Sequence, residues 1–239
     1  MIGAVLWRAL LLAAALVAIA VQFDRQAERS PEIAEVVPSA LRSTAQPRTV
    51  AMALSSGDPT LALEEARTLV ERRPLPAEHL RLLSLAQART GNPDAAVMTV
   101  QYAAQRGWRD GLVQEAMLRL ALDNGDETEA ARRFTALMMN SRARDEGLEA
   151  VASELLDEDG GTARATVAAI MGGDTRLQRR FVSRGARVLP PDAYIEIIER
   201  MAETGSHFEC RTITGAQTHL TSRDSSAGRA MTRLVEEAC

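Results

Sequence analysis

The chain repeats a short turn sequence at regular intervals: GDPTLA at residues 57–62, GNPDAA at residues 91–96 and GDETEA at residues 125–130. The glycines that begin these segments are 34 residues apart, and an alanine follows each glycine by five residues. A glycine ends a helix readily because it accepts the left-handed backbone conformation, and an alanine lets the next helix cross closely. The repeat therefore predicts successive helix-turn-helix units.

The remaining sequence also favours an all-α fold. From residue 47 to about residue 202 the apolar residues follow helical spacing, and no run of alternating β-branched residues predicts a strand. Gly160 lies 35 residues after Gly125, and Ala165 follows it by five, which predicts a fourth unit with one inserted residue. The tail at residues 205–239 is expected to cap the last pair. Helices are expected after the third unit at residues 145–156, 162–171, 175–189, 191–204 and 225–238.

A 34-residue period with glycine and alanine in this register resembles the tetratricopeptide repeat (TPR) family, whose unit is a helix-turn-helix. Matching residues are Leu61, Ala62, Leu69 and Pro74 in the first unit, Leu83, Ala96 and Ala103 in the second, and Phe134 and Leu137 in the third. Other positions depart from the motif: Ser84 and Leu118 replace its small residue, Ala53, Gln87 and Ala121 its tyrosine, and Trp108 and Arg142 its closing proline. These are degenerate repeats.

The resemblance covers residues 43–142 and could continue to residue 204. It implies a right-handed α-solenoid of TPR-like helix pairs over residues 47–204. The concave surface of such a fold binds a segment of another protein, and the resemblance implies no catalysis.

The N-terminal segment, residues 1–23, predicts that the chain is targeted to a membrane. Arg8 is its one charged residue, and the run from Ala9 to Val21 is uncharged, which is typical of a membrane anchor or of a secretory signal core. Ala18 and Ala20 could form a signal-cleavage site, whereas the whole segment is long enough to span a bilayer. A positive flank at Arg8 would keep the N-terminus in the cytoplasm. Residues 24–46 are predicted to be a linker with at most one short helix.

The two cysteines, Cys210 and Cys239, are predicted to form a disulfide, since an even pair in an exported chain is more often bonded than catalytic. Unpaired thiols are the first alternative. The second is a zinc site that adds His207 and His219, although the spacing lacks the close ligand pairs of structural zinc sites.

Composition excludes several classes of function. The net charge of −4 disfavours nucleic acid as a partner, because phosphate binding calls for a basic field. All 28 basic residues are arginine, so the chain cannot carry a Walker A lysine or a Schiff-base lysine. Aromatic residues make up only 3% of the chain, which disfavours a helical-toroid enzyme that acts on a glycan. We expect no catalytic site, no cofactor and no metal.

Charge changes sign sharply in the second half of the chain. Residues 145–159 contain seven acidic residues and no basic one. Five arginines then share one side of a predicted helix, opposite Leu177, Phe181 and Val188. They are Arg176, Arg179, Arg180, Arg184 and Arg187, and they are called the basic face below. The basic face either pairs with the acidic helix or binds an anionic partner.

A second candidate surface follows from the resemblance, because the first helix of each pair lines the inner face in the family. Matching positions are Glu78, Arg81, Leu85 and Arg89 in the second unit, and Leu112, Glu115, Arg119 and Asp123 in the third. These groove residues could hold an acidic-apolar segment, with arginine forks on its carboxylates. The alternative is that the arginines pair with Glu78, Glu115 and Asp123 on neighbouring helices.

These observations together predict a membrane-tethered adaptor that mediates protein-protein contacts in a bacterial envelope complex, for example a polysaccharide or secretion apparatus. The expected location is the inner membrane, with a single span and the body in the periplasm. A soluble periplasmic chaperone would result if the N-terminal segment were cleaved. The assignment of a pathway rests on fold analogy alone.

Overall fold

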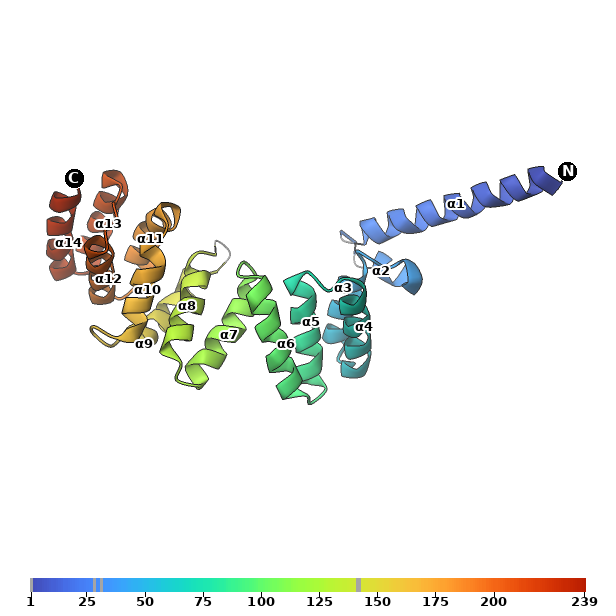
Figure 1. Ribbon diagram of the computed structural model, residues 1–239, viewed down its shortest axis with the longest axis horizontal. Helices are drawn as coiled ribbons and strands as arrows, with labels where there is room; N and C mark the ends of the chain where they lie inside the picture. The colour runs from blue at the N-terminus through green and yellow to red at the C-terminus, as the bar shows by residue number, and fades with distance from the viewer. Residues whose placement is uncertain (1, 28, 31, 141–142) are drawn as a thin grey trace. The chain divides into compact units, whose positions relative to one another are not determined.

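Figure 1 shows a computed structural model of the chain, which describes residues 2–27, 29–30, 32–140 and 143–239. Pro31 of the predicted linker and Arg142 at a motif position lie outside the described residues. Within these ranges the regular structure is helical, with no β-strand. The predicted all-α class is therefore confirmed. The chain forms two compact units, which comprise residues 1–107 and residues 108–239.

Unit 1 contains α1 (Ile2–Gln26), α2 (Ile33–Val36), the 3-10 helix η1 (Ser39–Leu41), α3 (Gln46–Ser56), α4 (Pro59–Arg72), α5 (Ala77–Arg89) and α6 (Pro93–Arg106). Helix α4 packs against α3 and α5, and α5 packs against α6. Helices α3, α4 and α5 share a small aliphatic core, whose buried residues are Val50, Ala53, Leu54, Ala62, Ala66, Leu69, Leu82 and Ala86. Burial of these side chains is the main force that holds the helix pairs together.

The three repeated turns have the conformation that the sequence predicts. Gly57, Gly91 and Gly125 have φ values of 80°, 76° and 67°, which place them in the left-handed region. After two of these glycines an aspartate caps the next helix: the carboxylate of Asp58 accepts from the Leu61 N–H at 2.9 Å, and Asp126 does the same for Glu129. Each turn thus ends one helix and begins the next within two or three residues.

The alanines of the repeat lie where helices cross. Ala62 and Ala130 are fully buried, and Ala96 is 6% exposed. Ser84, which departs from the family motif, is also buried, and its hydroxyl donates to the Ala96 carbonyl across the α5–α6 contact at 2.8 Å. A hydroxyl is tolerated at this position because it finds a partner on the facing helix.

The predicted linker, residues 24–46, packs against the end of α1. Ala27, Ala34, Val37 and Ala45 form a small buried cluster. The carboxylate of Asp24 in the last turn of α1 is itself buried. It accepts from the backbone N–H groups of residues 43, 44 and 45 at 2.8–2.9 Å, immediately before α3 begins. Asp24 therefore fastens α1 to the first helix pair.

Unit 2 contains α7 (Gly111–Asp123), α8 (Glu127–Met138), α9 (Asp145–Leu155), α10 (Thr162–Gly172), α11 (Thr175–Val188), α12 (Pro191–Glu203), α13 (Cys210–Arg223) and α14 (Ser225–Ala238). Two rows of packed helices are present: α10 contacts α8 and α12, and α12 contacts α14, while α11 contacts α9 and α13. One apolar core extends through the described helices of this unit from Leu118 on α7 to Met231 on α14.

The fourth unit follows the expected turn but not the expected register. Gly160 has φ 73°, as a helix-ending glycine should. However, Ala163 and Arg164 are buried on α10, whereas Ala165 is only half-buried. The expectation that Ala165 occupies the crossing position is therefore wrong. The partners of Arg164 lie on α12 and on the turn before α10. The side of α10 that carries Arg164 therefore faces α12.

Candidate partner-binding surfaces

The groove residues are divided between the two units. Glu78, Arg81, Leu85 and Arg89 lie on α5 of unit 1, and Leu112, Glu115, Arg119 and Asp123 lie on α7 of unit 2. Each set is therefore considered within its own unit.

On α5 the groove residues combine an apolar side chain with charges that have partners in the protein. Leu85 is 44% exposed. Arg81 lies 3.8 Å from the Glu78 carboxylate, three residues earlier on the same helix. Arg89 donates to the carbonyl of Leu54 in the last turn of α3, so it ties α5 to α3. The sequence did not predict this structural contact for Arg89.

On α7 the pattern is similar. Leu112 is 59% exposed, and the exposed Arg119 pairs with Glu115 one turn earlier on the same helix. Two described ion pairs, Arg81 with Glu78 and Arg119 with Glu115, thus join partners that the alternative interpretation names, and each of these two pairs lies along one helix. An exposed pair of this kind contributes only about 0.3–0.5 kcal/mol, so it leaves the arginine available to a ligand.

Helix α11 carries the basic face, and its opposite side is apolar as predicted. Phe181 and Val188 are buried, and Leu177 packs against the core. The Phe181 ring stacks on Tyr194 of α12 with 6.1 Å between centroids. Asp174 caps the helix, since its carboxylate accepts from the Arg176 N–H at 2.7 Å.

The five arginines of the basic face have different roles. Arg184 is only 7% exposed. Its guanidinium donates to the carbonyls of Met138, Asn140 and Ala143 at 2.6–2.7 Å and pairs with Asp145. Arg184 therefore holds the end of α8 to the start of α9. Arg184 therefore follows the internal-pairing alternative, because its position on α11 faces that connection.

The other four arginines are exposed. Arg187 lies 3.6 Å from Asp145, and Arg179 lies 3.2 Å from Glu209, which precedes α13. Internal pairing with the acidic helix is thus confirmed for Arg184 and Arg187, through Asp145. Within the described part of the chain Arg176 and Arg180 have no ion-pair partner, so they remain free to bind an anion.

Two adjoining hollows open beside these arginines, each of about 520 Å³. The first lies between α11 and the start of α9, and the second between α11 and α13. Both are lined by Arg179, Ser183 and Arg187. Arg176, Arg180, Arg184, Ala143 and Asp145 complete the first hollow. Ala186, Glu209, Arg211, Thr212, Gly215, Ala216 and His219 complete the second.

Sequence reasoning missed Arg211 as a member of this surface. It comes 24 residues after Arg187 in the chain, and only the packing of α13 beside α11 brings it to the same hollow. His219, which the sequence suggests only as a zinc ligand, also lines the second hollow.

A buried cluster around Arg164 was also missed. Arg164 is 1% exposed, and its guanidinium contacts carboxylate oxygens of Asp159, Asp192 and Glu196 at 2.6–2.8 Å. Burial by itself would raise the pKa of Glu196, but hydrogen bonds from Arg164 and from the Gly160 N–H lower it below its ordinary value. The cluster joins the α9–α10 turn to α12, so its role is structural. It also gives Asp159 of the acidic run a partner.

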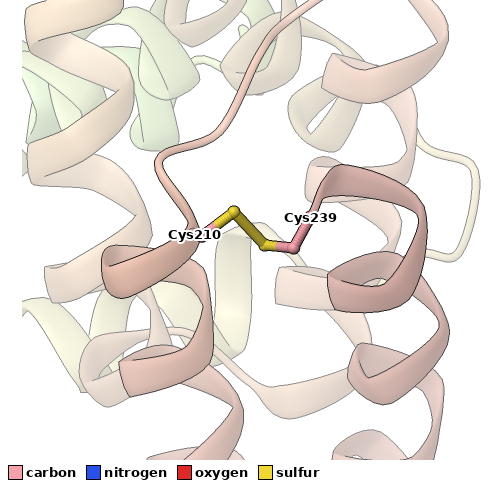
Figure 2. The surroundings of a disulfide bond; sticks show 2 residues. All are labelled: Cys210 and Cys239. Atoms are coloured by element: carbon pink, nitrogen blue, oxygen red, sulfur yellow. A yellow bond between two sulfur atoms is a disulfide. The ribbon is translucent and has the colours of Figure 1, made fainter.

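The cysteine pair is bonded in the structure. Figure 2 shows the Cys210–Cys239 disulfide, which joins the first residue of α13 to the residue after α14, with 5.6 Å between the Cα atoms. At the other end of this hairpin Asp224 ends α13 and caps α14 by accepting from the Ser226 N–H. Since both sulfurs are bonded to each other, neither is available as a thiolate ligand for zinc.

Helix α1 is long and apolar enough to cross a membrane. Its segment Val5–Gln26 has 22 residues and a mean hydropathy of 2.1, and none of the apolar window is buried in the protein. The same features suit a signal sequence.

No protein-family model matches the chain, and no curated protein or solved structure matches it either. The function must therefore be argued from the surfaces themselves.

Proposed function

We propose that the chain is a membrane-tethered adaptor, in which a right-handed solenoid of TPR-like helix pairs binds segments of other proteins. In this proposal α1 spans the inner membrane of a bacterium and the helical body lies in the periplasm, where it serves the assembly of an envelope complex. The observation that carries it is the attachment of α1: its apolar side chains are uncovered, while Asp24 in its last turn is fastened to the body.

The dimensions of α1 support the tether. At about 1.5 Å per residue, 22 helical residues extend about 33 Å, which is enough for a hydrocarbon core of about 30 Å. An uncovered helix of this length would be costly in water, because its apolar side chains have no protein surface to pack against. The buried Asp24 supports the proposal, because its hydrogen bonds join the last turn of α1 to the start of the first helix pair.

The surfaces of the body support binding more than chemistry. Exposed Leu85 and Leu112 lie among charged residues on α5 and α7, and such mixed surfaces suit protein segments. The disulfide suits the oxidising periplasm. A glycan-cleaving enzyme would call for paired carboxylates across a cleft and aromatic platforms for sugars. The hollows beside α11 are instead lined mainly by arginines and small residues.

Alkaline extraction of membranes followed by N-terminal sequencing tests the tether. The adaptor proposal expects the full chain in the membrane pellet, with its sequence beginning before Ala18. Recovery of a soluble chain that begins at or near Val21 would replace the anchor with a cleaved signal, and would favour a soluble chaperone.

Affinity purification of the full chain with mass spectrometry tests the adaptor role. A defined set of envelope proteins should be enriched, and a variant with Leu85→Ser and Leu112→Ser should lose part of that set. If neither the full chain nor this variant enriches any envelope protein, the adaptor role is wrong.

A further inference from the structure

We propose that the two hollows beside α11 form one continuous site for an extended acidic segment of a partner protein. This inference rests on the proposed function and deepens it, because it assigns the surface and the chemistry of the ligand. The site is called the α11 site below. It consists of the side chains of α11 and α13 that line the hollows, together with the start of α9.

The continuity of the α11 site follows from its shared wall. Arg179, Ser183 and Arg187 follow one another at intervals of four residues along α11, so they lie in a row on one side of the helix. All three line both hollows. A ligand that occupies one hollow therefore meets the same side chains as a ligand in the other, and one chain can cross between them.

The charge of the α11 site selects an anion. As the structure describes them, the two hollows are lined by six arginines and two carboxylates, Asp145 and Glu209. Arg184 is occupied by its buried contacts. Arg176, Arg180 and Arg211 are exposed and form no ion pair within the described residues, so they keep their full capacity to bind carboxylates. A planar guanidinium can hold a carboxylate by two parallel hydrogen bonds.

The lining of the α11 site favours a peptide over a membrane surface. Both hollows are shallow and open, so the side chains along them decide between the two ligands. The second hollow is lined in part by the exposed Gly215, which has no side chain and therefore lets a peptide backbone approach closely. Asp145 and Glu209 interrupt the row of arginines, so the site suits spaced anionic groups better than a continuous run of negative charge. A segment with spaced Glu or Asp side chains can place each carboxylate next to an arginine and avoid Asp145 and Glu209.

A direct binding experiment tests the site without knowledge of the natural partner. The full chain is placed in nanodiscs of neutral lipid, and a fluorescent peptide of twelve residues that alternates Glu with Ala is titrated at low salt. The matched control peptide has Gln in place of Glu. The test variant carries Arg176→Gln and Arg180→Gln. The control variant carries Arg229→Gln and Arg233→Gln on α14, which removes the same charge from exposed positions outside both hollows.

The α11 site predicts that the Glu peptide binds and the Gln peptide does not. The test variant should bind at least about tenfold more weakly, which is about 1.4 kcal/mol, while the control variant stays within about twofold of the wild type. Equal losses in both variants would show only a general charge effect and would overturn the proposal. Unchanged binding in the test variant would also overturn it.

A second arm separates peptide from lipid. Vesicles that contain phosphatidylglycerol are added in place of the Glu peptide, and their binding to the wild type and to the test variant is measured. If they bind through Arg176 and Arg180 while the Glu peptide does not, the ligand is a membrane surface and the peptide proposal is wrong. Failure of the site is distinguishable from failure of the adaptor function: partners that still co-purify with the test variant would retain the function and move the interface to another surface.

Discussion

The helix pairs α3–α4, α5–α6 and α7–α8 differ from the helices α9 to α14 in the contacts that join the helices within them. In the earlier part, glycine turns recur every 34 residues and buried alanines allow the helices to cross. In the later part, the period lapses, and polar links join the helices: the Arg164 cluster, the contacts of Arg184 and the disulfide. Apolar packing is present in both parts, since one core extends from Leu118 on α7 to Met231 on α14. The comparison teaches that, where the period is lost, a few long polar side chains add specific connections to that core.

The largest effect is expected from the disulfide. Replacing Cys210 and Cys239 together by serine should lower the free energy of unfolding of unit 2 by roughly 3–4 kcal/mol in the loop-entropy model. Chemical denaturation followed by circular dichroism measures the change. Thiol labelling of the denatured, non-reduced wild type should find almost no free thiol. Full labelling of both cysteines would show that the disulfide is not formed and does not stabilise the later helices.

A matched pair of arginines one turn apart on α11 tests the buried polar links. Arg184→Ala should cost unit 2 about 3 kcal/mol, because it leaves the carbonyls at the end of α8 without their donor and removes the closer of the two arginines that pair with Asp145. Arg180→Ala removes an exposed side chain and should change stability by less than about 0.5 kcal/mol. The free energy of unfolding is measured by denaturation for both variants. Equal losses would show that the buried contacts of Arg184 do not stabilise the unit more than exposed Arg180 does.

Replacing a turn glycine and a helix glycine by alanine tests whether the turns depend on the left-handed glycine conformation. Gly125 has φ 67°, so Gly125→Ala should destabilise unit 2 by about 1 kcal/mol through backbone strain alone. Gly147 lies within α9, and an added Cβ there meets no atom within 4 Å. Gly147→Ala should therefore stabilise the unit by about 0.5–1 kcal/mol, because alanine is the better helix former. Opposite signs in thermal unfolding are the expected result, and the same sign for both would contradict it.

The smallest expected effect is on the stability of the protein at low pH. Glu196 has a lowered pKa in the folded protein, so its stabilising contribution is complete above its unfolded value of 4.5. The contribution is lost as the pH falls below 4.5 and through the folded-state pKa. Neighbouring charges are Arg164 and Arg200, and the carboxylates of Asp159 and Asp192 contact the same Arg164 guanidinium as Glu196. Glu196→Gln should flatten the loss of stability between about pH 5 and pH 3. If the free energy of unfolding depends on pH in the same way in wild type and variant, Glu196 does not stabilise the Arg164 cluster.

Sequence reasoning reached the local features of the fold. Turn glycines, capping aspartates and buried alanines have local causes, so Gly57, Asp58 and Ala62 could be placed from the sequence alone. The apolar side of α11 and the cysteine pair were equally accessible, the first from helical spacing and the second from cysteine count.

The remaining features depend on contacts between residues far apart in the chain. Asp24 acts on residues 43–45, Arg164 on Asp192 and Glu196, and Arg184 on Met138. Nothing in the helical spacing distinguishes buried Arg184 from exposed Arg180, because both lie on the polar side of α11. Only the approach of α8 and α9 decides which arginine is enclosed. The α11 site could be predicted in part for the same reason, since Arg211 joins it through the packing of α13.

The most direct test of the adaptor role is photo-crosslinking in intact cells. A photoreactive amino acid replaces Arg180 in the α11 site, or Arg233 on α14 as the matched control, and membranes are washed at alkaline pH before analysis. The account predicts a discrete adduct of the chain with another protein from position 180, retained in the membrane pellet, and none from position 233. An adduct-free chain at both positions, or a body that leaves the membrane in the alkaline wash, would contradict a membrane-tethered adaptor that binds through this surface.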